Sequence, residues 1–219
     1  MSAKVITIAQ QKGGAGKTTM AAHLAVCWAG QKKKVAMVDI DPQASLSTWF
    51  SLRQSVLGEA AEKNLNLSVI SGWRVKSEIE RLRHAYDVIV VDSPPHTDTE
   101  ARTAIRAADL VVIPLQPSPM DVWATKGTID ICKQERVPVK MVLNRVHPQA
   151  RLTEAVAGEM IGLTSSRFGN RVIFAGALMH GLGVTEAEPN SQAAEEVRAL
   201  AREIMQYLGR KTAAQKHSA

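Results

Sequence analysis

The stretch Gln11-Lys12-Gly13-Gly14-Ala15-Gly16-Lys17-Thr18-Thr19 decides the fold. Before it, residues 4–9 are rich in β-branched and apolar side chains, which predicts a buried parallel strand. After it, residues 20–29 carry Ala, Leu and Val at helical spacing. A strand, a glycine-rich turn and a helix form a phosphate-binding setting, because the glycines let backbone N–H groups surround an anion and the helix N-terminus adds positive charge.

Two side chains in this stretch match the roles of the P-loop lysine and hydroxyl. Lys17 would reach the β- and γ-phosphates of a nucleotide, and the Thr18 hydroxyl would bind Mg²⁺. The loop departs from the standard pattern, because Gln11 replaces its first glycine and a second lysine, Lys12, precedes the glycine pair. This form resembles the deviant Walker A loop of the ParA/MinD family of P-loop ATPases. The resemblance implies ATP and ADP as ligands and a Lys12 that reaches across a dimer interface to the partner's nucleotide.

Two carboxylates follow the apolar run of residues 35–38, in the sequence Asp39-Ile40-Asp41-Pro42-Gln43. Ligands of open α/β sheets gather at the C-terminal ends of strands, where both carboxylates would lie. The DxDPQ pattern resembles switch I of the ParA/MinD family. By that resemblance, Asp41 positions or activates the attacking water and Asp39 supports the magnesium shell. A helix-capping turn before Ser45 would explain one of these carboxylates but not both together with Pro-Gln.

A further carboxylate, Asp92, ends the apolar run of residues 86–92. This is the Walker B arrangement, in which the aspartate holds Mg²⁺ through water opposite Thr18. The following Ser93-Pro94-Pro95 resembles the switch II of the family, which senses the γ-phosphate. The family often has an adenine-contacting asparagine where Asn144 ends a predicted strand, although a lone asparagine there is equally compatible with no base contact.

These motifs define the predicted sites. The expected nucleotide contacts are Lys12, Gly13, Gly14, Ala15, Gly16, Lys17, Thr18, Thr19 and Asn144. The expected metal residues are Thr18, Asp39 and Asp92. The residues expected to act in catalysis are Lys12, Lys17 and Asp41, through charge neutralisation at the phosphates and orientation of water.

Apolar periodicity along the rest of the chain alternates between strands and helices. We expect helices over residues 44–60, 75–84, 99–108, 123–135, 151–162 and 192–208, and strands over 65–70, 109–115, 137–144 and 171–174. Ser118 and Asp121 are well placed to start the helix near residue 123. The alternation predicts one α/β domain over residues 1–209, with a mostly parallel sheet and helices on both faces, followed by a basic, flexible tail over 210–219.

Composition narrows the class of protein. The 219 residues are 45% hydrophobic and 22% charged, which excludes a disordered chain, and no apolar run approaches the ~20 residues that span a bilayer. Cys27 and Cys132 lack CxxC spacing, so we expect buried, reduced thiols and a cytoplasmic protein rather than an iron–sulfur protein. The net charge of +6 suggests an anionic partner besides the nucleotide. Residues 175–189 depart from the longer, arginine-bearing segment that family members usually carry here.

The resemblance implies a short partition or positioning ATPase without a helix-turn-helix domain. Such a protein forms a homodimer with ATP, hydrolyses it slowly until a ParB-like or cargo adaptor stimulates it, and binds DNA non-specifically on a bacterial nucleoid. The alternative is a MinD-like protein at a membrane, which the tail after Gly209 disfavours because it has no large apolar residue.

Four basic residues are the predicted DNA contacts: Arg198, Arg202, Arg210 and Lys211. Arg198 and Arg202 lie one helical turn apart on the last predicted helix. The competing interpretation is that the arginines pair with acidic neighbours on a solvated helix face; these neighbours are Glu195, Glu196 and Glu203.

Overall fold

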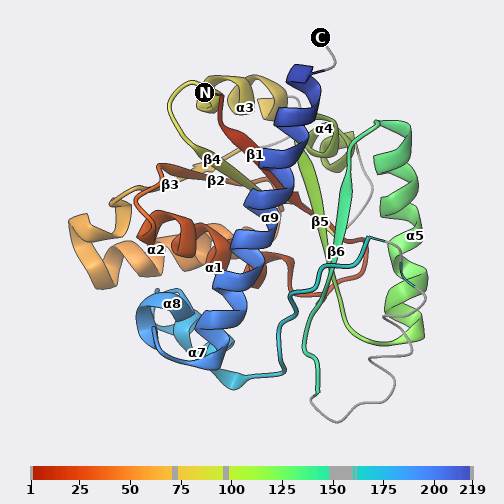
Figure 1. Ribbon diagram of the computed structural model, residues 1–219. Helices are drawn as coiled ribbons and strands as arrows, with labels where there is room; N and C mark the ends of the chain where they lie inside the picture. Colours follow the sequence, from red (N-terminus) through yellow and green to blue (C-terminus); the bar gives the residue numbers. More distant parts are fainter. Residues whose placement is uncertain (1, 71–73, 96–98, 148–159, 161, 218–219) are drawn as a thin grey trace.

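Six parallel strands form a single sheet in the order β3-β2-β4-β1-β5-β6 in the computed structural model (Figure 1). The structure describes residues 2–70, 74–95, 99–147, 160 and 162–217, with side chains up to Lys211. The strands are β1 (Lys4–Ile8), β2 (Val35–Asp39), β3 (Leu65–Val69), β4 (Val88–Asp92), β5 (Leu110–Leu115) and β6 (Val139–Leu143). The helices are α1 (Lys17–Gly30), α2 (Ser45–Leu57), the 3-10 turn η1 (Gly58–Glu62), α3 (Val75–Arg83), α4 (Thr99–Ala107), α5 (Pro119–Gln134), α7 (Val172–Met179), α8 (Val184–Ala187) and α9 (Gln192–His217).

Both faces of the sheet are covered, as the sequence predicted. Alternate residues of a strand point to opposite faces, so Ile6 and Ile8 of β1 pack with α1 and α9 whereas Val5 packs with α3 and α4. A third cluster joins β5 and β6 to α5. Strands buried on both faces need continuous apolar sequence, which is what the sheet carries.

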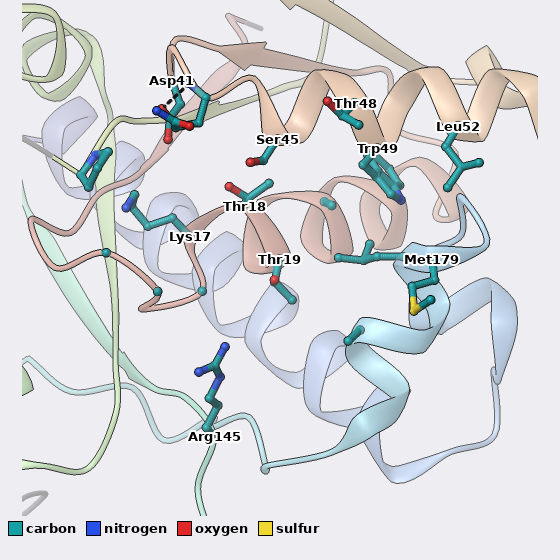
Figure 2. A pocket seen from close by; sticks show the side chains of 18 residues that line it. Lys17, Thr18, Thr19, Asp41, Ser45, Thr48, Trp49, Leu52, Arg145 and Met179 are labelled. Atoms are coloured by element: carbon teal, nitrogen blue, oxygen red, sulfur yellow. Dashed lines mark hydrogen bonds between the residues drawn. The ribbon is translucent and has the colours of Figure 1, made fainter.

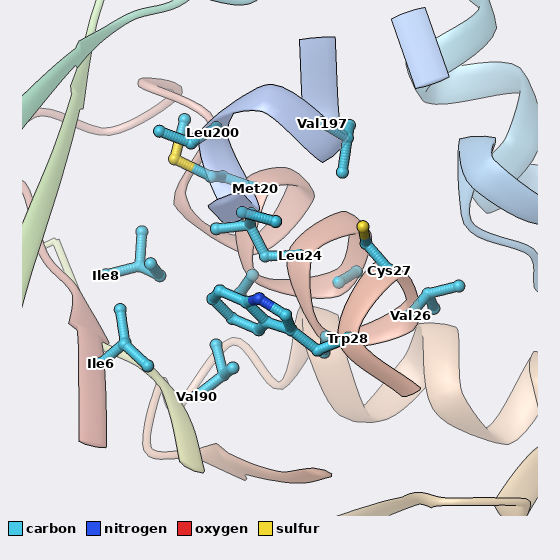
Figure 3. Close-up of a cluster of buried hydrophobic side chains, with 14 of the residues drawn as sticks. Ile6, Ile8, Met20, Leu24, Val26, Cys27, Trp28, Val90, Val197 and Leu200 are labelled. Atoms are coloured by element: carbon cyan, nitrogen blue, oxygen red, sulfur yellow. The ribbon is translucent and has the colours of Figure 1, made fainter. Parts of the chain in front are cut away.

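Helix α1 lies between the sheet and α9 (Figures 1 and 3). Trp28 and Leu24 are fully buried against this layer, and Met20 near the start of α1 packs toward Leu200 of α9. Each such large apolar side chain contributes about 1.5–3 kcal/mol by leaving water. The helix that follows the glycine-rich loop is therefore held rigidly on both sides.

Most predicted elements are confirmed, with shifts at their ends. Helix α5 begins at Pro119 rather than Trp123, because the Ser118 hydroxyl caps it by accepting from the backbone N–H of Asp121. Helix α9 continues to His217, beyond the predicted end at Leu208. The predicted helix over residues 151–162 lies almost wholly outside the described residues. Within the described part of the chain, no helix is long and apolar enough to cross a membrane.

The strand predicted over residues 171–174 is wrong. Residues 172–179 form helix α7 instead, and the sheet edge is extended by isolated bridges at Leu163 and Gly169. The Val-Ile-Phe run has high β-propensity, but Phe174 stacks on Phe168 with ring centroids 5.1 Å apart in the core. Tertiary packing therefore overrides local propensity in this run.

Candidate functional site

The glycine-rich loop and the predicted carboxylates meet at the carboxyl ends of adjacent strands. Asp92 at the end of β4 is in register with Ile8 of β1 on one side and with Asp39 of β2 on the other. The loop leaves β1 directly after this point and enters α1 at Lys17. Residues that are distant in the sequence are thus brought together at the sheet edge where parallel α/β folds bind ligands.

Glycines shape the loop for close approach of a ligand. Gly14 and Gly16 have φ values of +74° and +96°, in the left-handed region that favours glycine. A Cβ placed on Gly13 or Gly14 would meet nothing within 4 Å, so the backbone at both positions is open. The two glycines therefore leave room for a ligand to approach the loop backbone closely, as a phosphate cradle requires.

Thr18 and Asp92 form the centre of the site. The Thr18 hydroxyl donates to Oδ2 of Asp92 at 2.7 Å, while Oδ1 of the buried Asp92 has no hydrogen-bond partner. Burial raises the pKa of Asp92 to about 7, and the Asp39 charge adds to this against the hydrogen bond from Thr18. A hydroxyl and an unpaired buried carboxylate oxygen are the hard donors that Mg²⁺ prefers, so these two residues fit the implied cation.

Lys17 is buried beside these groups, with 7% of its surface exposed. Burial lowers the pKa of Lys17, and the charges of Asp92 and Asp41 oppose that shift. The lysine thus brings a positive charge to a site that also holds carboxylates. Its charge would attract the phosphates of a nucleotide, and a bound cation would offset the neighbouring carboxylates.

The two carboxylates of the predicted switch I have different surroundings. Asp39 is buried, its Oδ1 accepts from the backbone N–H of Asp41 and its Oδ2 accepts from that of Ser47 at 2.9 Å, so it anchors the start of α2. Asp41 lines the cleft above the loop, close to Lys17 (Figure 2). A place for Asp39 in the metal shell stays a prediction, since both of its oxygens already accept from the protein.

Lys12 pairs within its own chain. Its ammonium lies 2.6 Å from Oδ2 of Asp121 on α5, and the side chains are 39% and 2% exposed. Burial would raise the pKa of Asp121, but hydrogen bonds from Lys12 and Ser118 hold it below its usual value. The sequence pattern does not predict this partner of Lys12, and the Ser118–Asp121 turn is the only local feature that draws attention to Asp121.

A cleft of about 690 Å³ opens over the loop. One end holds Lys17 and Asp41, and the other lies between α2 and α7, where Trp49 and Leu52 face Met179 (Figure 2). A second cavity of about 320 Å³ extends from Gly16 past residues 168–172. The loop is therefore the meeting point of two cavities.

Asn144 lines the smaller cavity, at the end of β6. Its Nδ2 donates to the carbonyl of Ala15 at 2.8 Å and its Oδ1 accepts from the N–H of Arg145, so its amide braces the loop. The predicted contact with adenine stays a prediction.

The predicted DNA contacts lie on α9, away from the cleft. Arg202 donates to Oε1 of Glu195 at 2.6 Å, while Arg198 donates to the carbonyl of Pro189 and lies 3.8 Å from Glu195. Arg210 is exposed and Lys211 half-buried. Glu195 thus makes the acidic pairing that the competing interpretation expected, whereas Glu196 pairs with Arg171 and Glu203 accepts from Ser165 and Ser166.

The cysteines are buried thiols, as predicted. Burial raises the pKa of Cys27 to about 11 and that of Cys132 to about 12, so neither is a reactive thiolate at neutral pH.

Comparison with known proteins agrees with this geometry. The "maintenance of carboxysome distribution protein A" of Halothiobacillus neapolitanus is 28% identical over 216 residues, covering 91% of this chain and 95% of that protein. The protein of the same name from Gloeobacter kilaueensis is 33% identical over 158 residues, covering 71% and 69%. An ATP complex of a McdA variant from Cyanothece superposes with a TM-score of 0.75 at 20% identity over 95% of this chain and 97% of that one, which shows the fold alone.

The profile of one family spans nearly the whole chain. It is the CobQ/CobB/MinD/ParA nucleotide binding domain, and it matches residues 6–212. The match includes the glycine-rich loop, both strand-end carboxylates and most of α9. The glycine-rich loop, the Thr18–Asp92 pair and this match together show that the chain belongs to the CobQ/CobB/MinD/ParA nucleotide-binding family of P-loop proteins.

Proposed function

We propose that this protein is an ATP-dependent dimerising switch of ParA type that hydrolyses ATP slowly. The Thr18–Asp92 pair carries the proposal, because it joins the loop hydroxyl to a buried carboxylate with an unpaired oxygen, beside Lys17. This arrangement suits a nucleotide with Mg²⁺ and has no evident structural purpose of its own. Triphosphate is the favoured ligand because Asp41 faces the cleft beyond the loop, where a γ-phosphate and its attacking water would lie.

Each residue has a definite part in the proposed reaction. Loop N–H groups and Lys17 bind the phosphates and neutralise charge that develops on them, while Asp41 orients the attacking water. Thr18 and Asp92 hold the cation, which when bound offsets phosphate charge. Lys12 leaves Asp121 and reaches the nucleotide of the second copy in the dimer, so hydrolysis depends on association.

The switch would act in the cytoplasm on the bacterial nucleoid. We propose that the ATP-bound dimer binds DNA without sequence preference and that a ParB-like or cargo adaptor stimulates hydrolysis and release. The names of the relatives, which refer to carboxysome distribution, support a role in positioning a cargo. The net charge of +6 agrees with a polyanionic partner.

Replacing the loop lysine tests the proposal. Lys17→Ala removes a charge-assisted contact worth about 1.5–3 kcal/mol, so ATP affinity should fall roughly 10- to 150-fold and turnover should be lost. Lys133→Ala, which removes an exposed lysine on α5, is the matched control and should leave both unchanged. Titration calorimetry and phosphate release measure the two quantities. Normal ATP affinity and turnover in Lys17→Ala would contradict the assignment.

A further inference from the structure

The segment from α7 through α8, residues 172–187, forms a wall of both cavities at the loop. Leu178 and Met179 line the larger cleft, Phe174 lines the smaller cavity, and Ala175 lines both. This α7–α8 segment includes most of the stretch in which the sequence departs from its family. What holds it in place therefore determines the shape of the nucleotide cleft.

The buried side chain of Arg53 on α2 binds this segment through an ion pair and hydrogen bonds. The side chain is 4% exposed, and its two terminal nitrogens meet the two carboxylate oxygens of Glu186 on α8, each at 2.7 Å. It also donates to the carbonyls of Gly181 and Ala61, at 3.1 and 3.2 Å. Only the arginine of this pair is buried, since the Glu186 side chain is 36% exposed. Such an ion pair gains little net stability, so its distinctive property is a defined geometry between the elements that it joins.

The backbones of α2 and the α7–α8 segment also lie in direct contact. Gly181 has a φ of +70°, and a Cβ placed on it would lie 2.7 Å from Cα of Arg53. Glu186 also accepts from the N–H of Gly183, which orients the start of α8. The glycine and the ion pair thus let α2 and the turn before α8 lie directly against each other.

The same segment is tied to α1 by His23. Its Nδ1 accepts from the N–H of Val184 and its Nε2 lies 3.1 Å from the carbonyl of Phe174. Because α1 is fixed between the sheet and α9, these contacts tether the segment at Phe174 and Val184, on either side of the cleft-lining residues, to the helix of the phosphate loop. Arg53 then links that assembly to α2.

Helix α2, which carries Arg53, is the element that we expect to respond to a γ-phosphate. It begins at Ser45, shortly after Asp41, and Asp39 holds its first turn through Ser47. If a ligand displaced Asp41, helix α2 would therefore transmit the movement to Arg53. Trp49 lies between the two ends of this path: it lines the cleft, and the Arg53 guanidinium sits 5.8 Å from its ring centroid.

We propose that Arg53 is a positioning residue that couples the γ-phosphate side of the cleft to its α7–α8 wall through Glu186. The inference rests on the proposed function, because it presumes that the cleft distinguishes nucleotides by their γ-phosphate. The coupling makes the position of the wall depend on whether Asp41 and α2 are engaged by a triphosphate. Its consequence is discrimination between ATP and ADP, rather than affinity for nucleotide as such.

Affinities for two nucleotides in the same variants test the coupling. Dissociation constants for ADP and for the non-hydrolysable AMP-PNP, each with Mg²⁺, are measured for the wild-type protein, Arg53→Met, Arg53→Lys and Glu186→Gln. In Arg53→Met the preference for AMP-PNP over ADP should fall about 5- to 20-fold, with ADP affinity within about twofold of wild type. Arg53→Lys keeps the charge but not the two-pronged geometry, so its preference should fall by less.

Controls separate coupling from a structural role. Arg106→Met removes an arginine that pairs with Glu135 at an exposed site on α4, and it should leave the preference unchanged. Trp49 fluorescence, identified by its loss in Trp49→Phe, should differ between the two nucleotides in the wild type and no longer differ in Arg53→Met. If Arg53→Met does not fold, Glu186→Gln keeps the shape of the site and should show the same fall in smaller degree.

The outcomes are distinct. An equal loss of ADP and AMP-PNP affinity in the Arg53 and Glu186 variants would assign the pair a purely structural role and overturn the inference, as would an unchanged preference. A wild-type protein that binds neither nucleotide would contradict the proposed function itself, and the inference with it.

Discussion

The ammonium of Lys12 lies 2.6 Å from the buried carboxylate of Asp121, in the same chain. A lysine expected to serve the nucleotide of a partner copy is thus held against its own α5. Lys12 must break its contact with Asp121 before its ammonium can reach the nucleotide of a partner copy. In the proposed dimerising switch, the ion pair should therefore favour the separate chain over the dimer.

Asp121→Asn tests this relationship. The substitution keeps the shape of the side chain and the oxygen that accepts from the backbone N–H of Gln116, but it removes the charge that retains Lys12. Because the pair is partly exposed, we expect a modest effect: half-maximal dimerisation at a roughly three- to fivefold lower ATP concentration. Sedimentation velocity across an ATP titration measures it. Asp130→Asn, which removes an exposed aspartate of the same helix, is the control, and unchanged or weaker dimerisation in Asp121→Asn would refute the expectation.

Asp41→Ala should separate binding from hydrolysis. Asp41 lines the cleft but holds neither the loop nor the Thr18–Asp92 pair, so the variant should still bind ATP with Mg²⁺. Without a group to orient water, turnover should fall about 100-fold or more and the ATP-bound dimer should accumulate. Sedimentation with ATP and a phosphate-release assay provide the test. A variant that stays monomeric, or that turns over at the wild-type rate, is incompatible with the assigned role.

His23 predicts a pH dependence of stability. Burial lowers the pKa of His23 to about 4 from 6.5, against the hydrogen bond to the Phe174 carbonyl that raises it, so the unfolded chain binds a proton that the folded one rejects. The contribution of His23 to the free energy of unfolding is fully present above pH 6.5. It falls by up to about 3 kcal/mol as the pH decreases toward 4.

Chemical denaturation between pH 4 and 7 checks this component. His23→Gln cannot titrate, so its unfolding free energy should vary less over that window than that of the wild type. His84→Gln, at an exposed histidine that follows α3, should keep the wild-type dependence. Equal pH dependence in the wild type and His23→Gln would exclude His23 as its source.

Arg198 and Arg202 provide the test of DNA binding. Replacing both with glutamate should abolish DNA binding by the ATP dimer and leave basal ATP hydrolysis near normal, because neither residue touches the cleft. DNA binding by the wild type should not depend on the DNA sequence and should weaken steeply as the salt concentration rises. The matched control reverses the charge of Arg102 and Arg106 on α4, which pair with Glu135. Full DNA binding by the α9 double variant would place the site elsewhere.

The pairing of Arg198 and Arg202 with Glu195 provides a second test of DNA binding. Glu195 engages Arg202 at 2.6 Å and lies 3.8 Å from Arg198, so it competes with phosphate for these arginines. Glu195→Gln should therefore tighten DNA binding, by about three- to fivefold for a surface pair, in a filter-binding or anisotropy assay. Weaker binding would mean that Glu195 orients the arginines instead. A wild-type dimer that bound anionic vesicles but no DNA at low salt would favour the membrane alternative.

The sequence by itself determined the fold class and the centre of the site. Glycines at 14 and 16 and apolar runs that end in Asp39 and Asp92 are local patterns, and each maps directly onto a strand end or a left-handed turn. Parallel pairing then places those strand ends together whatever the surrounding detail. The Thr18–Asp92 contact follows from these features alone.

Only the tertiary structure decided the contacts that couple the site to its surroundings. Lys12 and Asp121 are 109 positions apart, and Arg53 and Glu186 are 133 apart, so no local pattern pairs them. The Val-Ile-Phe run from Val172 has the composition of a strand, yet it forms a helix because Phe174 is buried against Phe168. Local propensities amount to tenths of a kcal/mol per residue, whereas burial of one such ring contributes about 1.5–3 kcal/mol, so long-range packing decides wherever the two conflict.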